Sequence, residues 1–343
     1  MRNKYLKIGI LLFSLISAMF SFYAWQIIKT PNFNVKEGEK YELLIQSDDT
    51  YDDVFNKLQK DSVIIDVLSF KFLSKFLKYT DHVKKGRYLI EAGQGNLEVI
   101  NKLRRGLQDP YKLIINSWRT KQDLAGRVSK QMPIDSLQII KLLDSSAYCN
   151  ELGFNSENIL SLFIPNTYFI YYTKDFDEIA QRMKKEYTKF WNDERKAKAQ
   201  RLGFNPIEIS ILSSIVEGES KKSIEQSRIA GVYFNRIKSN MPLQADPTVV
   251  FALKDFSIKR VTKKHTQFRS PYNTYINLGL PPGPISIPNI GVIDKVLNLE
   301  RNNYYYFCAN PDFSGTHVFA TSYTEHLKNA GLYQKALNEN RIQ

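Results

Sequence analysis

An uncharged apolar segment near the start of the sequence constrains this chain more than any other feature. It covers Ile8 to Ile28, and about 20 apolar residues are what a helix needs to cross a bilayer. Arg2, Lys4 and Lys7 precede it, so the positive-inside bias places the short N-terminus in the cytoplasm and everything after Lys29 outside. The alternative is a cleaved signal peptide, whose apolar core is usually shorter and ends in small residues. We expect an uncleaved anchor.

The composition narrows the classes of protein that the rest of the chain can belong to. A length of 343 residues suggests two domains. Cys149 and Cys308, the two cysteines, exclude a disulfide scaffold and a zinc site of three or four thiolates, and whether they pair with each other stays open. The net charge of +13 favours anionic surroundings. Export across a membrane argues against nucleic acid and for lipid headgroups or an acidic wall polymer.

The part that follows the anchor divides near residue 112 and predicts an α+β fold. Alternating apolar residues indicate strands over Tyr41–Gln46 and Gly86–Glu91, and helical spacing indicates two helices between them, over 51–59 and 65–77. Asn96 is expected to cap a trailing helix that ends at Gly106. The unit has the size of a small binding module.

The second part of the chain begins with a strand over 111–116 and a helix capped by Thr120. A long, charged helix is predicted over Phe176–Leu202, and its charges are typical of a solvated face. An aromatic strand over Tyr304–Ala309 and a partner strand over Thr316–Phe319 close the domain. This domain is therefore a larger, mixed α+β domain.

The most informative segment starts at Asn205, which is expected to cap a helix with Pro206 in its first turn. Nearly every side of this helix is apolar, so it is expected to be buried. Glu217 stands at its C-terminal end, with Gly218 as the expected stop. Burial and the negative end of the helix dipole both disfavour a charged carboxylate there, which suits a general acid. The simpler interpretation is a solvated residue that follows a core helix.

Three polar clusters follow that helix, each with a structural and a functional interpretation. The stretch Ile224–Asn240 predicts a second amphipathic helix, and Met241–Thr248 a stiff loop, because proline bounds it on both sides. The segment Gly279–Asn289 is rich in glycine and proline, which hold polar groups at low entropic cost. These clusters contribute the candidate sugar-binding residues Glu219, Asn235, Gln244, Asp246, Thr248, Tyr272, Asn273, Thr274, Tyr275 and His317.

These motifs resemble, in order and approximate spacing over residues 205–330, those of the endolytic murein transglycosylases, the YceG-like family. The resemblance rests on Ser214–Glu219, Phe234–Arg236, Leu243–Thr248, Tyr272–Ile285 and His317–Phe319. It implies that Glu217 is the catalytic glutamate. Upstream, the chain keeps an arginine of the family pattern at position 119 but has asparagine at position 166, where the family commonly has aspartate.

The resemblance also implies a reaction, a location and partners. A lytic transglycosylase cleaves the bond that follows N-acetylmuramic acid without water. One glutamate protonates the leaving oxygen and then takes the proton of the sugar's own C6 hydroxyl, so a 1,6-anhydro end forms. The implied location is the inner membrane with the catalytic domain outside, the substrate is nascent peptidoglycan, peptidoglycan synthases are partners, and no metal or cofactor is needed.

Two other functions stay open at this point. A hydrolytic muramidase needs a second carboxylate, for which Asp246 is the best candidate, and a scaffold that only binds the wall needs no catalytic glutamate. The predicted organisation is a cytoplasmic tail, a transmembrane helix, a linker, a LysM-like subdomain and a YceG-like catalytic domain, over residues 1–7, 8–28, 29–40, 41–112 and 113–343.

Overall fold

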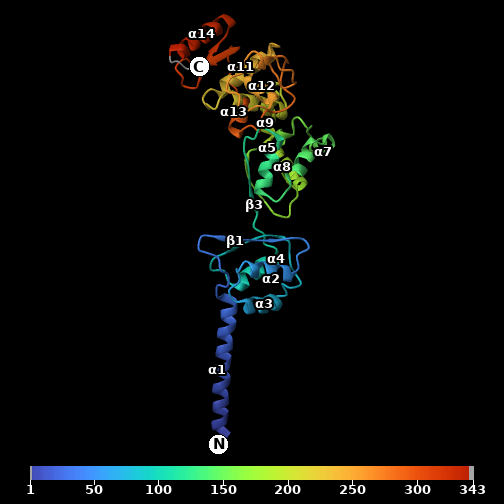
Figure 1. Ribbon diagram of the computed structural model, residues 1–343, viewed down its shortest axis with the longest axis vertical. Helices are drawn as coiled ribbons and strands as arrows, with labels where there is room; N and C mark the ends of the chain where they lie inside the picture. Colours follow the sequence, from blue (N-terminus) through green and yellow to red (C-terminus); the bar gives the residue numbers. More distant parts are fainter. Residues whose placement is uncertain (1, 340–343) are drawn as a thin grey trace. The chain divides into compact units, whose positions relative to one another are not determined.

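The computed structural model describes the backbone of residues 2–339 and the side chains of residues 6–339, and it divides into two compact units (Figure 1). The first unit comprises Met1–Lys112 with Phe169–Lys174, and the second comprises Leu113–Tyr168 with Asp175–Gln343. Both mix helices with small two-stranded sheets. The predicted α+β class is confirmed.

Helix α1 (Arg2–Lys29) contains the whole predicted apolar segment. Its portion Leu6–Lys29, 24 residues long, is long and apolar enough to cross a membrane, and its large side chains are exposed along most of its length. The predicted cytoplasmic charges of Arg2 and Lys4 lie outside the described side chains, and Lys7 is exposed.

The first unit follows the predicted order of strand, two helices, strand and helix. Its elements are β1 (Lys40–Ile45), α2 (Tyr51–Lys60), α3 (Val67–Phe76), β2 (Gly86–Glu91) and α4 (Asn96–Arg105). Strands β1 and β2 are antiparallel, with Lys40 opposite Glu91 and Ile45 opposite Gly86. Apolar side chains from the sheet and from all three of these helices share one core. The unit therefore buries a core of its own.

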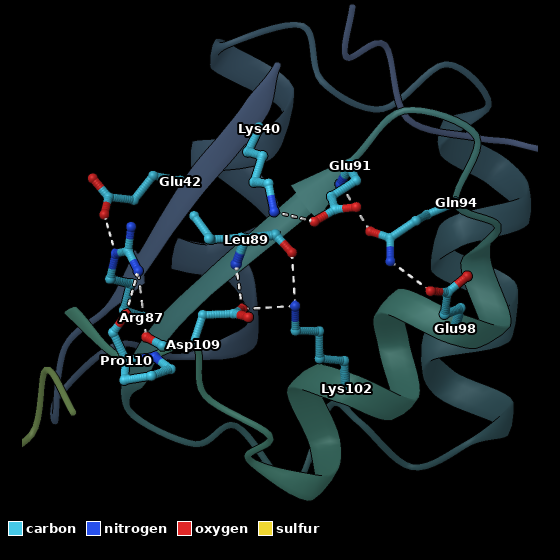
Figure 2. A network of polar contacts seen from close by, with 10 residues as sticks. All are labelled: Lys40, Glu42, Arg87, Leu89, Glu91, Gln94, Glu98, Lys102, Asp109 and Pro110. Carbon is cyan, nitrogen blue, oxygen red and sulfur yellow. Dashed lines mark hydrogen bonds and ion pairs between the residues drawn. The ribbon is translucent and has the colours of Figure 1, made fainter. Parts of the chain in front are cut away.

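A network of polar contacts lies along β2 and joins it to β1, to α4 and to the segment around Asp109 (Figure 2). Lys102 donates to the Leu89 carbonyl at 2.8 Å and pairs with Asp109 at 2.6 Å. Asp109 also accepts the Leu89 N–H at 2.7 Å. Arg87 forms an ion pair with Glu42 and donates to the Pro110 carbonyl at 3.1 Å. The network ties the segment that leads out of this unit to the sheet.

The prediction that Asn96 caps α4 is wrong. Gly95 occupies that position, without a side-chain bond, and Asn96 is buried in the first turn. Its amide donates to the Ser69 hydroxyl at 2.9 Å and to the Ile27 carbonyl at 3.3 Å, and its oxygen accepts from Asn32 at 2.8 Å. The reason is tertiary: the side chain holds the end of α1, which a local sequence pattern does not reveal.

The second unit begins within β3 (Tyr111–Ile115), and β4 (Asn166–Ile170) follows later in the chain. Between them lie three helices and a 3₁₀ turn: α5 (Lys121–Gln131), α6 (Ser136–Asp144), α7 (Ser146–Leu152) and η1 (Ile159–Leu162). Thr120 caps α5 in a capping box with Asp123, as the sequence predicts. Cys149 and Cys308 are free thiols.

The predicted long helix over Phe176–Leu202 is instead two helices, α8 (Phe176–Phe190) and α9 (Asp193–Leu202). Trp191 turns fully into the core at the break, and the Asn192 side chain caps α9 by accepting the Arg195 N–H at 2.9 Å. Burial of the indole ring and the new cap together explain the interruption.

The remaining elements surround the apolar helix α10 (Pro206–Glu219). They are α11 (Gln226–Lys238), α12 (Asp246–Leu253), η2 (His265–Gln267), α13 (Ile290–Leu297), β5 (Tyr306–Ala309), β6 (His317–Ala320) and α14 (Tyr323–Glu339). Helix α10 packs against α11, α12 and α13, so nearly all of its side chains are buried, as predicted. Strands β5 and β6 form the predicted antiparallel pair.

The substitution Asn96→Ala is expected to destabilise the first unit by about 1–3 kcal/mol, because the buried Asn32 amide keeps only its bond to the Asp66 carbonyl and the buried Ser69 hydroxyl loses the donor on Asn96. Hydrogen exchange of β1 and β2 in the detergent-solubilised full-length protein measures the effect. The control is Gln59→Ala on the exposed face of α2, which should leave exchange unchanged. Equal exchange in the two variants would contradict this account.

Candidate active site

The end of helix α10 forms the base of the candidate site. Asn205 begins the helix in a capping box with Glu208, as predicted, but the helix continues through Gly218 to Glu219. A Cβ atom on Gly218 would lie 2.8 Å from the Cβ of Pro247. Gly218 is therefore needed for the close approach of α12, and it does not stop the helix.

A cavity of about 420 Å³ opens beside this helix end. Its wall combines charged groups, hydroxyl groups and apolar surface. It is lined by Ser117, Arg119, Ser214, Gly218, Glu219, Lys221, Asp246, Pro247, Val250, Phe251, Phe256, Ile258, Lys259, Val261, Ile285 and Ser286. Two of the predicted site residues, Glu219 and Asp246, are in this set.

Glu219 has the most perturbed carboxyl group of the cavity wall. Burial raises its pKa to about 7, the negative charge of Asp246 adds to this shift, and a hydrogen bond from Tyr233 opposes it. The Tyr233 hydroxyl donates to the carboxylate at 2.7 Å. Because the pKa is close to neutral, this group can both give up and take back a proton at physiological pH.

Glu217 is also buried, but its carboxylate already has donors. It accepts the Ser117 hydroxyl at 3.2 Å and the Asn289 N–H at 2.8 Å, and the Lys221 ammonium lies 3.7 Å away. Glu217 is not one of the described residues that line the cavity. Its contacts join the helix end to two loops that are distant in the sequence.

Asp246 lies at the N-terminal end of α12 and faces the cavity. The Tyr275 hydroxyl donates to its carboxylate at 2.6 Å. Burial raises the pKa of Asp246, and this hydrogen bond works against the shift. The preceding Gln244 is exposed and has a positive φ of 53°. A rigid turn therefore directs Asp246 toward the site.

Three of the predicted sugar-binding residues instead hold loops together. Thr248 and Thr274 are buried and their hydroxyls lie 2.8 Å apart, and the Thr274 hydroxyl accepts the Ala245 N–H at 3.0 Å. Asn273 is buried and donates to the Phe268 carbonyl at 2.8 Å. As sugar ligands these residues stay predictions, and their contacts make the cavity wall stiff.

Tyr272 and Gly283 anchor the segment Gly279–Asn289, which is rich in glycine and proline and is called the strap below. The Tyr272 hydroxyl donates to the Glu157 carboxylate at 2.9 Å, and its ring packs on Phe251 with centroids 4.8 Å apart. A Cβ atom on Gly283 would lie 1.9 Å from the Glu157 carbonyl oxygen, so only glycine fits there. These contacts bring the strap against the loop that precedes η1.

Asn235 and His317 are also bound within the protein. Asn235 donates to the Asn302 and Tyr304 carbonyls, both at 2.9 Å. His317 Nδ1 lies 2.9 Å from the Glu225 carboxylate. Although burial raises the pKa of Glu225, hydrogen bonds from Ser220 and His317 hold it below its ordinary value. Neither Asn235 nor His317 belongs to the set of described residues that line the cavity.

Sequence reasoning did not assign several cavity residues to the site. Ser117 and Arg119 come from the loop after β3, and Phe256 and Lys259 from the loop after α12. The Arg119 guanidinium lies 4.8 Å above the Phe256 ring. The signal for Arg119 was its match to the family pattern. Phe256 and Lys259 carry no local signal, because only the fold brings their loop to the helix end.

A half-buried carboxyl group with a near-neutral pKa beside a polar cavity suits an enzyme that works by acid–base catalysis. The pattern of the YceG-like family matches residues 43–331, and the chain belongs to this family. Its curated relatives are named as a lytic transglycosylase, which is a lyase. We class this chain with these enzymes.

Individual relatives support this assignment. The endolytic murein transglycosylase of Bacillus subtilis (strain 168) is 27% identical over 298 residues, which cover 82% of this chain and 81% of the relative. The protein of the same name from Streptococcus pneumoniae (strain D39) is 24% identical over 79% of this chain, and only 54% of that relative is covered. A crystal structure of a yceG-like protein from Listeria monocytogenes aligns with a TM-score of 0.55 and 26% identity, over 84% of this chain and 99% of that chain.

The substitution Thr274→Val is expected to destabilise the second unit by about 1–3 kcal/mol, because the buried Ala245 N–H loses its acceptor and the Thr248 hydroxyl keeps only its bond to the Ala245 carbonyl. Thermal unfolding followed by circular dichroism measures the change. The same substitution at Thr188, which is exposed on α8, is the matched control and should shift the transition little. A Thr274→Val variant as stable as the control would refute the structural role of this pair.

Proposed function

We propose that this chain is a membrane-anchored lytic transglycosylase that cleaves peptidoglycan strands internally. The bond broken links N-acetylmuramic acid to N-acetylglucosamine, and the product carries a 1,6-anhydro end. The observation that carries the proposal is Glu219, a half-buried residue that lines the cavity and whose carboxyl group has its pKa raised to about 7. Membership of the YceG-like family and the names of the relatives support the substrate.

The proposed reaction uses one carboxyl group twice. Protonated Glu219 gives its proton to the glycosidic oxygen as the bond to C1 breaks, and the leaving sugar departs with a new hydroxyl. The Glu219 carboxylate then takes the proton of the C6 hydroxyl while that oxygen bonds to C1. Atoms and charges balance without water. The nucleophile belongs to the same sugar, so no second carboxylate is needed.

We assign the proton donor to Glu219 and a positioning role to Glu217, whereas the sequence motif favoured Glu217 as the donor. Two observations support this choice. Glu219 lines the cavity and its pKa is raised toward neutrality, which a proton donor needs at physiological pH. Glu217 accepts hydrogen bonds from Ser117 and Asn289, and these contacts join the helix end to two loops.

The charge of the cavity suits a polyanionic glycan. Arg119, Lys221 and Lys259 line it together with the two carboxyl groups. Peptide stems and lactyl groups of peptidoglycan carry carboxylates, and a guanidinium or ammonium group attracts them. The Phe251 and Phe256 rings in the same wall offer apolar faces against which a sugar ring can pack.

Anchoring follows from α1 in this proposal. The helix is long and apolar enough to span a membrane. The basic residues Arg2, Lys4 and Lys7 at its start orient the N-terminus toward the cytoplasm. The catalytic unit then lies outside the inner membrane, where nascent strands are made. Peptidoglycan synthases are the partners that this location favours.

The matched variants Glu219→Gln and Glu217→Gln test the assignment. Glu219→Gln should lower the cleavage rate by about 10²–10⁴-fold, because an amide cannot donate the proton, and Glu217→Gln should have the smaller effect. Mass spectrometry of digested peptidoglycan measures the products of each folded variant, and the wild type should give anhydro ends. If Glu217→Gln is the inactive variant, Glu217 is the acid. Reducing ends would instead indicate a hydrolase, with Asp246 as the second carboxylate, and unchanged glycan a scaffold.

The pH profile provides a separate test. As the pH rises through about 7, Glu219 loses its proton, so kcat/KM should fall about tenfold per pH unit above that point. Tyr233→Phe removes the hydrogen bond that stabilises the Glu219 carboxylate. Its loss raises the pKa of Glu219 and moves the falling limb of the pH profile to higher pH. Tyr323→Phe, at an exposed tyrosine, should leave the limb in place. A limb that stays fixed or moves to lower pH in Tyr233→Phe refutes the assignment.

A further inference from the structure

Helix α3 carries large apolar side chains on its outward face as well as on the face that packs on the core. Phe70 and Leu73 face the core together with Ser69 and Ser74, while Leu68, Phe72 and Phe76 point outward with exposed fractions of 77%, 61% and 72%. The Phe72 and Phe76 rings stack with centroids 6.3 Å apart. Ile65, just before the helix, is 64% exposed. Contiguous apolar surface of this kind marks a binding face.

The position of this face relative to α1 is fixed by contacts inside the first unit. Tyr23 of α1 and Ile65 line one cavity of about 180 Å³. The Asn96 amide reaches the Ile27 carbonyl, and a Cβ atom on Gly95 would lie 3.2 Å from the Ile28 carbonyl oxygen. Figure 1 shows α3 beside the end of α1. The apolar face therefore begins level with Tyr23.

The depth of Tyr23 in a spanning helix determines what covers this face. Tyr23 precedes the helix end at Lys29 by six residues, or about 9 Å along the axis. Helices that lie in a membrane interface bury their apolar face by about 5–10 Å. Tyr23 and Trp25 have the position of an interfacial aromatic belt. The outward face of α3 thus lies at the boundary between headgroups and acyl chains.

Charge on α3 matches the same surroundings. Lys71, Lys75 and Lys78 are exposed beside the apolar residues. Lysines that flank an apolar face can extend toward phosphate groups while their stems cover apolar surface. Acidic residues are absent from α3 itself, over Val67–Phe76. An anionic phospholipid surface offers both an apolar layer for the exposed apolar side chains and phosphate groups for the lysines, and we therefore favour it over a second protein.

We propose that α3 binds the outer surface of the membrane, with Ile65, Leu68, Phe72 and Phe76 in the lipid interface. This inference rests on the proposed spanning role of α1 and adds a second, interfacial contact. The first unit is then held flat against the bilayer by two elements and does not swing freely on a single helix.

Fluorescence quenching by lipid tests this proposal with the full-length protein. Single cysteines replace Phe72, Leu12 or Gln46 in a Cys149→Ser, Cys308→Ser background, and each carries an NBD label. The vesicles contain phosphatidylethanolamine and phosphatidylglycerol with bromine on the acyl chains near the headgroups. Leu12 lies within α1, and Gln46 is exposed at the end of β1. Circular dichroism checks that each variant folds.

The label at Phe72→Cys should be quenched at least about twofold, as expected for a site at the acyl boundary. The label at Leu12→Cys should also be quenched, and the one at Gln46→Cys should not. If Leu12→Cys is quenched but Phe72→Cys behaves like Gln46→Cys, the interfacial contact is refuted while anchoring stands. If neither Leu12→Cys nor Phe72→Cys is quenched, anchoring fails and this inference fails with it.

Discussion

Packing around the end of an apolar helix is the constraint on which this site depends. Helix α10 packs against α11, α12 and α13, and its residues Ile209–Glu217 are buried. Gly218 lets α12 approach, because a Cβ atom there would clash with Pro247. Burial and the negative charge of Asp246 raise the pKa of Glu219, and the hydrogen bond from Tyr233 limits the rise. The state of this proton therefore follows from packing and from the neighbouring carboxylate.

Much of the fold could be predicted because its signals are local. Caps at Thr120 and Asn205 and alternating strands predict most elements of both units within a few residues. The failures lie where tertiary contacts override a local pattern. Trp191 interrupts a helix because its ring fits the core, and Asn96 leaves the capping position because it holds the end of α1.

The site was less predictable than the fold, for the same physical reason. The sequence singled out the end of α10 and the loop with Asp246, because apolar helices that end in acids and proline-bounded turns are visible locally, and the cavity lies beside both. Polar side chains such as Thr274 and Asn235 looked equally suited to binding sugar, yet their partners are protein groups far along the chain. The proposed choice between Glu217 and Glu219 rests on the residues that line the cavity and on the raised pKa of Glu219, and neither is visible in the sequence.

The most direct measurement is the titration of the Glu219 carboxyl itself. Infrared difference spectra of the full-length protein and Glu219→Gln, recorded across a pH series, isolate the band of this one protonated group. The account predicts that the band disappears with a midpoint near pH 7. A midpoint near 4.5, the ordinary value for glutamate, would show that the carboxyl is solvated and would contradict its role as the proton donor.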